Sequence, residues 1–168
     1  MSILANQLAD RIQEGAATLA NFARELNDAQ WKLVVPRDGR TIGVIVHHVA
    51  SMYPIEMGVV QQAVEGKPIT DVTWELVAEI NAKHAKEMAS VGKTEALDLL
   101  ARNSLEAARA VRKLTDADLT RSVPFSLSFG APMTVQFVVE DHPLRHPWHH
   151  LARIKAALRA IDRTSAAA

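Results

Sequence analysis

The sequence contains no cysteine among its 168 residues. A disulfide framework, a thiolate metal ligand and a thiol nucleophile are therefore excluded, which leaves histidine and carboxylate side chains as the available metal ligands. Any reactive thiol must come from a substrate. Aromatic residues are also scarce, at 5% of the chain. We therefore expect a core built mainly from Ala, Val, Leu, Ile and Met, a set that favours helices packed on helices.

Net charge is absent as well, because Lys and Arg together number 19, and so do Asp and Glu. With no net field and no local concentration of Lys or Arg, we expect no nucleic acid and no membrane among the partners. Long hydrophobic runs are missing too. Polar residues such as Asn6, Asp10 and Glu14 interrupt the apolar residues of segment 1–21, so neither a signal peptide nor a spanning segment is predicted. A cytoplasmic location is the expectation that follows.

The sequence does contain clear helical patterns. A length of 168 residues fits one domain, and we predict a single domain over residues 1–168. Apolar residues recur every three or four positions, which predicts helices over Ile3 to Leu26, about Ile42 to Val64, Trp74 to Met88, a Thr94 cap to about Lys113, and Met133 or Thr134 to Ile161. Between the last two, residues 121–132 hold Ser, Pro and Gly among alternating apolar residues. This pattern predicts a long connection, either an extended loop or a short strand.

Four long helices and one short extra helix predict an all-α fold, a four-helix bundle. We expect one long crossover connection, placed between the last two long helices. The three tryptophans, Trp31, Trp74 and Trp148, are expected in the buried core rather than at a pocket. Within the last helix, Pro143 and Pro147 each remove a backbone donor, so this helix is expected to kink or to begin late.

The seven histidines are unevenly distributed, because four of them, His142, His146, His149 and His150, lie within nine residues. His146 and His150 are four positions apart, so they lie about one turn apart on one face of a helix, where two imidazoles can reach one ion. His142 extends the same stripe one turn earlier. A metal site of useful strength needs a third ligand from another helix.

Helical phase favours His48 as that third ligand. In the helix predicted over 42–64, His48 shares its sector with apolar residues such as Met52, whereas the neighbouring His47 falls near Ser51. We therefore predict that His48, and not His47, faces inward.

A site made of His48, His146 and His150 would offer three neutral nitrogens and leave a position open for water or substrate. This open arrangement is typical of a catalytic metal rather than a structural one. Imidazole suits zinc and nickel, so a divalent metal, Zn or Ni, is the expected cofactor. The remaining candidates are interpreted as solvated or hydrogen-bonded side chains: His47, His84 and His142.

Two segments of the chain resemble the DinB-like (DinB/YfiT) superfamily. TIGVIVHHVA at residues 41–50 is similar to the second-helix motif of that family, and HPWHHLARI at residues 146–154 is similar to its HxxHHxxxI signature. The separation of the two motifs, about 100 residues, is also close to that of the family. The resemblance implies a four-helix bundle, commonly dimeric, with a divalent metal on one histidine of the second helix and two of the last. These ligands correspond to His48, His146 and His150.

The resemblance also implies a metal-dependent enzyme, because family members of known activity include bacterial thiol-dependent S-transferases and a mycothiol-dependent maleylpyruvate isomerase. Our first hypothesis is that the metal keeps a low-molecular-weight thiol as thiolate and directs it onto an electrophilic small molecule. A metal-dependent hydrolase is the second hypothesis. The third is a non-catalytic helical bundle that acts in dimerisation or partner binding. We expect a homodimer with a small-molecule substrate.

No catalytic group is assigned by the sequence, but three carboxylates lie near the predicted ligands. Asp141 or Glu140 can accept a ring N–H and so fix the tautomer of a ligand. Glu56, two turns after His48, can do the same or act as a base. The alternative for each is a solvated acid on a helix surface.

Overall fold

The computed structural model describes residues 2–166 of the chain. Its helices are α1 (Ile3–Glu25), α2 (Asp28–Trp31), α3 (Ile42–Val64), α4 (Trp74–Glu87), α5 (Lys93–Val111), α6 (Asp116–Thr120), α7 (Val135–Val139) and α8 (Arg145–Ala166). Two short strands, β1 (Ser122–Pro124) and β2 (Pro132–Thr134), flank the 3-10 turn η1 (Ser126–Ser128) and pair antiparallel. A π-helical turn, η2 (Glu140–Leu144), joins α7 to α8. The predicted all-α fold is confirmed.

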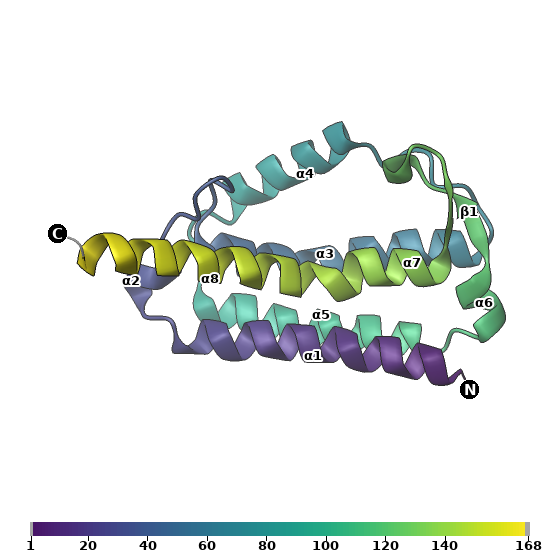
Figure 1. Cartoon of the computed structure of the whole chain (residues 1–168), viewed down its shortest axis with the longest axis horizontal. Coiled ribbons are helices and arrows are strands. Elements are labelled where there is room, and N and C mark those ends of the chain that lie inside the picture. The colour runs from purple at the N-terminus through teal and green to yellow at the C-terminus, as the bar shows by residue number, and fades with distance from the viewer. Residues whose placement is uncertain (1, 167–168) are drawn as a thin grey trace.

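Four long helical segments lie side by side as a bundle: α1, α3, α5, and the continuous helix formed by α7, η2 and α8 (Figure 1). α5 packs against α1 and α3, and α8 packs against the same two helices from the other side. The stripes of apolar residues face this shared core, where Leu8, Ile12 and Leu19 of α1 are fully buried. Each such side chain stabilises the bundle by about 1.5–3 kcal/mol. Within residues 2–166, no helix combines the length and the apolarity that crossing a bilayer requires.

The long crossover lies between α3 and α5, not between the last two long helices as predicted. Because α3 and α5 run in the same direction, residues 65–92 must return along the length of the bundle, and α4 occupies much of that path (Figure 1). The connection from α5 to α7 contains α6 and the β1–β2 hairpin, but it begins and ends at the same end of the bundle. Periodicity marks where a helix lies in the sequence and not which way it runs.

Two further expectations are corrected. α5 begins at Lys93 with Gly92 at its N-cap and no side-chain cap, so Thr94 lies inside the helix and does not cap it. Trp31 is buried as expected, but Trp74 is 63% exposed and Trp148 is 38% exposed. The reason for Trp74 is its place in the first turn of α4, a helix none of whose residues is buried.

The prolines of the last helix are accommodated by the π-helical turn rather than by a break. The backbone N–H of Arg145 donates to the carbonyl of Glu140, a wider turn than the α-helical one, and Pro143 lies within it. The helix therefore continues from α7 into α8, but its phase changes. His142 packs edge-on against Phe125, with ring centroids 5.5 Å apart, and both side chains line the same pocket as His146 and His150.

α8 approaches α1 closely at the level of the histidine cluster. A Cβ atom on Gly15 of α1 would lie 2.8 Å from Nε1 of Trp148 and 2.9 Å from Cγ of Pro147. Since real Cβ contacts are longer than this, only glycine allows the first turn of α8 to sit against α1 at this point.

Candidate metal centre

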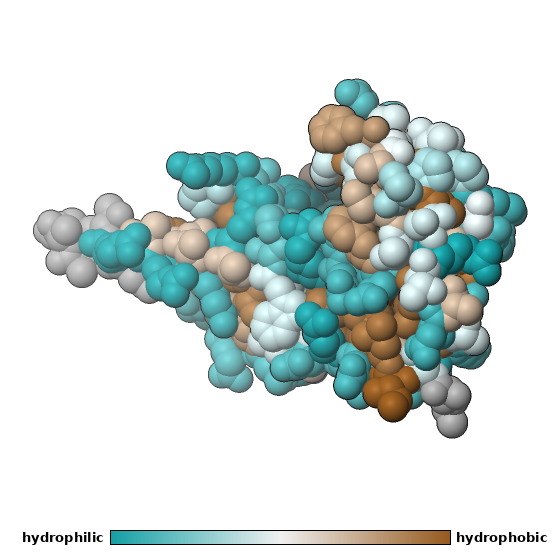
Figure 2. All heavy atoms as spheres, turned by 45° about the vertical axis from the view of Figure 1, so that its right-hand side comes forward, coloured by the Kyte–Doolittle hydropathy of each residue, from teal (hydrophilic) through white to brown (hydrophobic). Residues whose placement is uncertain are grey.

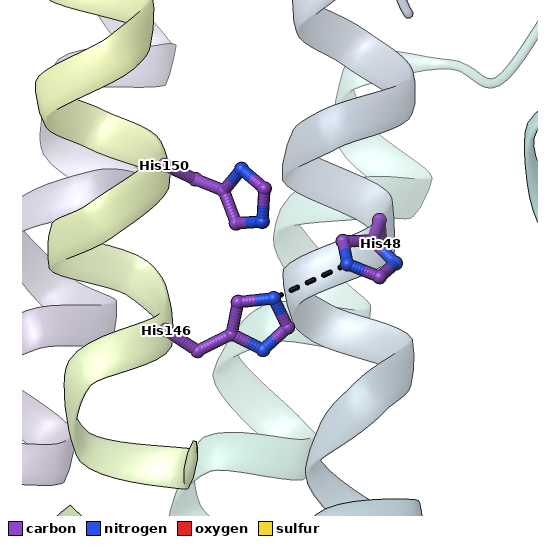
Figure 3. Close-up of side chains that lie close together, drawn as sticks. All are labelled: His48, His146 and His150. Carbon is purple, nitrogen blue, oxygen red and sulfur yellow. Dashed lines mark hydrogen bonds between the residues drawn. The ribbon is translucent and has the colours of Figure 1, made fainter. Parts of the chain in front are cut away.

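His48 of α3 and His146 and His150 of α8 point into the space between the two helices (Figure 3). Nε2 of His48 lies 3.2 Å from Nε2 of His146. One ring nitrogen from each of the three side chains lies within 4.8 Å of the other two. Two helices far apart in the sequence thus bring together the three histidines that the sequence singled out.

The separation of two of these nitrogens matches the ligand spacing of a tetrahedral divalent ion. Zinc–nitrogen bonds of about 2.0–2.1 Å place two ligands of a tetrahedron about 3.3 Å apart, and the nitrogens of His48 and His146 are separated by 3.2 Å. Three protein ligands leave the fourth position free. The donor set and its geometry therefore suit a divalent ion with one position open to a second molecule.

Burial keeps two of the three rings neutral. His48 and His150 are buried. Desolvation lowers the pKa of His48 far below its ordinary value, and the neighbouring His146 and Arg40 lower it further. Burial, together with the same two neighbours, lowers the pKa of His150 to about 2. Both rings thus keep a nitrogen lone pair at neutral pH, as metal coordination requires.

Glu56 orients the third ring. Its Oε1 atom lies 2.7 Å from Nδ1 of His146, and Glu56 is itself buried. Because a carboxylate can only accept, Nδ1 of His146 carries the proton, and a neutral ring then has its lone pair on Nε2, toward His48. A carboxylate in this position fixes the tautomer and increases the basicity of a histidine ligand.

The other predicted carboxylates pair with arginines. Oδ1 of Asp141 is 3.0 Å from Nε of Arg145, one turn later in the same helix. Oε1 of Glu140 is 3.7 Å from Nη1 of Arg11 on α1. Of the three candidates, Glu56 is the one that the structure places in contact with a histidine of the triad.

His47 and His84 form a second pair beside the triad. Nδ1 of His47 lies 2.8 Å from Nε2 of His84 on α4, and the two rings are stacked. His47 is therefore hydrogen-bonded, but it is buried just as His48 is, and the prediction that only His48 faces inward is wrong. The physical reason is that the crossing helix α4 covers a second face of α3. Burial, followed by the charges of His47 and Arg40, lowers the pKa of His84 to about 4.

A pocket of about 470 Å³ opens beside the triad, between α3, α4 and α8. Its volume is in the usual range for small-molecule sites, about 300–1,000 Å³. All three histidines and Glu56 line it, and so does Arg40, which precedes the Thr41 N-cap of α3. Arg40 could not be recognised from the sequence, since a single arginine before a helix carries no recognisable pattern.

Comparisons with known proteins agree with this architecture. The chain is similar to the solved structure of YfiT from Bacillus subtilis, which is described as "a probable metal-dependent hydrolase with an unusual four-helix bundle topology". The TM-score is 0.77 and the sequence identity is 18%, and the match covers 96% of this chain and 90% of that chain. At such low identity the likeness shows the fold alone. No curated protein matches the chain. A family model described as the DinB superfamily matches residues 11–154, which run from α1 into α8. The chain therefore belongs to the DinB superfamily.

Proposed function

We propose that this protein is a metal-dependent enzyme whose divalent ion, zinc or nickel, is held by His48, His146 and His150. The observation that carries the proposal is the triad of ring nitrogens within 4.8 Å of one another at the wall of a pocket. An ion bound there would supply Lewis acidity, which favours the deprotonated form of a thiol or of water at neutral pH. The description of YfiT as metal-dependent supports the same assignment.

The reaction that we propose is transfer of a low-molecular-weight thiol to an electrophilic small molecule. The chain has no cysteine of its own, so a sulfur nucleophile must enter with a substrate. A pocket of about 470 Å³ has room for a small molecule next to the triad. In this reaction the thiolate sulfur forms a bond to the electrophilic carbon, and the leaving group departs with its electron pair. The role of Glu56 is to hold the proton on Nδ1 of His146 and so keep that ring in place.

Hydrolysis is the second candidate. It is favoured by the description of YfiT as a probable hydrolase, and an open three-histidine site serves water activation as well as thiol activation. The residues lining the pocket are compatible with either nucleophile, so substrate tests must separate the two reactions.

A pair of assays tests the proposal. The protein, loaded with Zn²⁺ or Ni²⁺, is assayed for conjugation of cysteine or glutathione to 1-chloro-2,4-dinitrobenzene, with release of chloride, and for hydrolysis of p-nitrophenyl acetate. Conjugation that disappears in a His150→Ala variant supports thiol transfer. Hydrolysis that disappears in the variant, without conjugation in the native protein, supports the hydrolase. Rates that are equal in the native protein and the variant would favour the non-catalytic bundle.

Glu56→Gln is expected to weaken metal binding by about 10–100-fold, the usual effect of removing a carboxylate that supports a histidine ligand. Glutamine has the same shape but no charge, and its amide can present a donor instead of an acceptor to His146. Competition with a chromophoric chelator measures the affinity. Glu140→Gln is the matched control, because Glu140 lies on the same continuous helix as two of the histidines but pairs with Arg11. Equal metal affinities of the two variants would contradict a role of Glu56 in the metal site.

Two expectations from the sequence stay predictions. One is the homodimer, which sedimentation equilibrium of the purified protein tests directly. The other is the single domain over residues 1–168, which a single cooperative unfolding transition would support.

A further inference from the structure

Arg40 is a partly buried cation with unused hydrogen-bonding capacity. Its side chain is 13% exposed, and its Nε and Nη2 atoms donate to Oδ1 and Oδ2 of Asp38 at 2.6 and 3.1 Å. Its Nη1 atom is buried and has no hydrogen-bond partner among residues 2–166. A guanidinium has five N–H groups, so the edge formed by Nη1 and Nη2 still has donors to offer. Because an unmatched buried donor of a charged group is costly, this edge suits a further acceptor.

The same corner of the pocket carries an excess of positive charge. Nη1 of Arg153 lies 3.6 Å from Oδ2 of Asp38, so two guanidinium groups share one carboxylate. Both arginines line the pocket, and Asp38 is their only ion-pair partner within the described part of the chain. Arg145, also at the pocket, is paired with Asp141 and is neutralised locally. The excess therefore lies at the Arg40–Arg153 end.

Beyond the triad the pocket has several apolar walls, although Glu56, His142 and the Asp141–Arg145 ion pair also line it. The apolar walls are Ile55 and Val59 of α3, Val77 and Ile80 of α4, and Phe125 after β1. Along α3, at 1.5 Å per residue, His48 lies about 9 Å from the start of the helix beside Arg40, and Val59 lies about 16 Å beyond His48. The triad thus lies between a cationic end and these apolar walls. Figure 2 shows apolar side chains mixed with polar ones on the surface at the end of the molecule where α4 begins and the hairpin lies, and a more continuous apolar patch lower down, near the start of α1.

We propose that the pocket binds small carboxylates with an apolar body, and that Arg40 is the residue that selects them. The carboxylate accepts hydrogen bonds from the unpartnered Nη1–Nη2 edge of Arg40, an arrangement that guanidinium groups favour, and because Nη1 is buried the side chain must rotate toward the pocket to make them. Arg153 adds positive charge at the half-exposed rim, where its side chain is 37% exposed. The apolar body lies between α3 and α4, across the face of the triad. This inference names the substrate class of the site proposed above and rests on that function for the reaction, while the binding step itself needs no metal.

Calorimetric titration of the chelator-treated protein tests the inference without metal. The probes are hexanoate, octanoate and 4-phenylbutyrate, each paired with its neutral amide. We expect at least one acid to bind. We expect its amide to bind with an affinity that is lower by a factor of about ten or more. Arg40→Lys keeps a positive charge beside Asp38 but loses the planar set of guanidinium donors. This variant is expected to weaken binding of the acid by about tenfold or more. Arg109→Lys is the matched control, on an exposed arginine of α5 that pairs with Glu106 outside the pocket.

A second variant keeps the test valid if Arg40→Lys does not fold. Arg153→Gln, at the half-exposed rim, is expected to reduce both the affinity for the acid and the dependence of that affinity on salt. Failure of all three acids to bind, equal binding of acid and amide, or unchanged binding in both arginine variants would overturn the inference.

The outcomes also separate this inference from the proposed function. Acid binding that requires added Zn²⁺ and persists in Arg40→Lys would place the carboxylate at the triad, which overturns the role of Arg40 and leaves the metal site standing. Acid binding that depends on Arg40 in a protein that retains no Zn²⁺ or Ni²⁺ would support the inference and contradict the proposed metal enzyme.

Discussion

His150→Ala lowers the affinity for Zn²⁺ or Ni²⁺ by more than 100-fold, which is the largest effect that we expect on the site. Removing a group that merely supports a ligand costs about 10–100-fold, and His150 would be one of only three protein ligands. The ring is buried, and its centroid lies 5.3 Å from that of His48 and 4.9 Å from that of His146. Alanine leaves two histidines, which make a weak site.

His149→Ala is the control for this prediction. His149 is the next residue back on α8 and its ring contacts that of His150, but it is exposed and is not one of the three clustered ligands. Elemental analysis of each protein, purified without a tag and dialysed against metal-free buffer, gives the retained metal. A chelator competition gives the affinity. Near-native metal content in His150→Ala, or equal losses in the two variants, would be incompatible with the proposed ligand set.

Asp38→Asn destabilises the fold by about 3–5 kcal/mol, the usual result of removing one partner of a buried ion pair. The side chain of Asp38 is 3% exposed and lies between Arg40 and Arg153. Asparagine retains the shape but leaves two positive charges without a carboxylate, and the Arg40 charge is largely buried. Urea unfolding at pH 7 measures the change. A loss below about 1 kcal/mol, as for an exposed pair, would mean that solvent screens this pair despite its burial.

The stability difference between the native protein and Asp38→Asn also depends on pH. Burial by itself would raise the pKa of Asp38, but the hydrogen bond from Arg40 and the charges of Arg40 and Arg153 outweigh it and lower this pKa below its ordinary value. A lowered pKa in the folded state means that the pair stabilises the fold above the unfolded-state pKa of about 3.9 and loses this effect as the pH falls through the folded-state pKa. Urea unfolding repeated in steps below pH 4 should show the difference shrinking. A constant difference would indicate that the carboxylate does not contribute through its charge.

Much of the site could be predicted from the sequence because its signals are local. His146 and His150 are four positions apart on one helix, and that spacing alone places both rings on one face. The phase of His48 among apolar residues pointed to a histidine that the structure places beside this pair, and the metal that the three side chains would hold stays a prediction. The positions of the long helices could be predicted for the same reason, since each is marked by its own apolar stripe.

Other features depended on contacts between distant segments. His47 is buried because α4 crosses over α3. The apolar pattern of α3 does not indicate that another helix covers this face. The π-helical turn at Pro143 changes the phase of the last helix between His142 and His146, and a local pattern assumes uniform α-helical phase. Arg40 reaches the pocket from a loop, where no periodicity indicates a direction.

The sequence by itself determined the absence of an intrinsic thiol, which follows from composition alone. It also determined the helices and the pair His146 and His150, because each of these depends on residues within a few turns of one another. Only the tertiary structure decided that the crossover runs through α4, that Glu56 meets His146 across two helices, and that Arg40 lies at the charged end of the pocket. The physical reason is that the direction of each helix and the helices that it contacts follow from the burial of whole apolar faces against one another. No single segment of the chain contains that information.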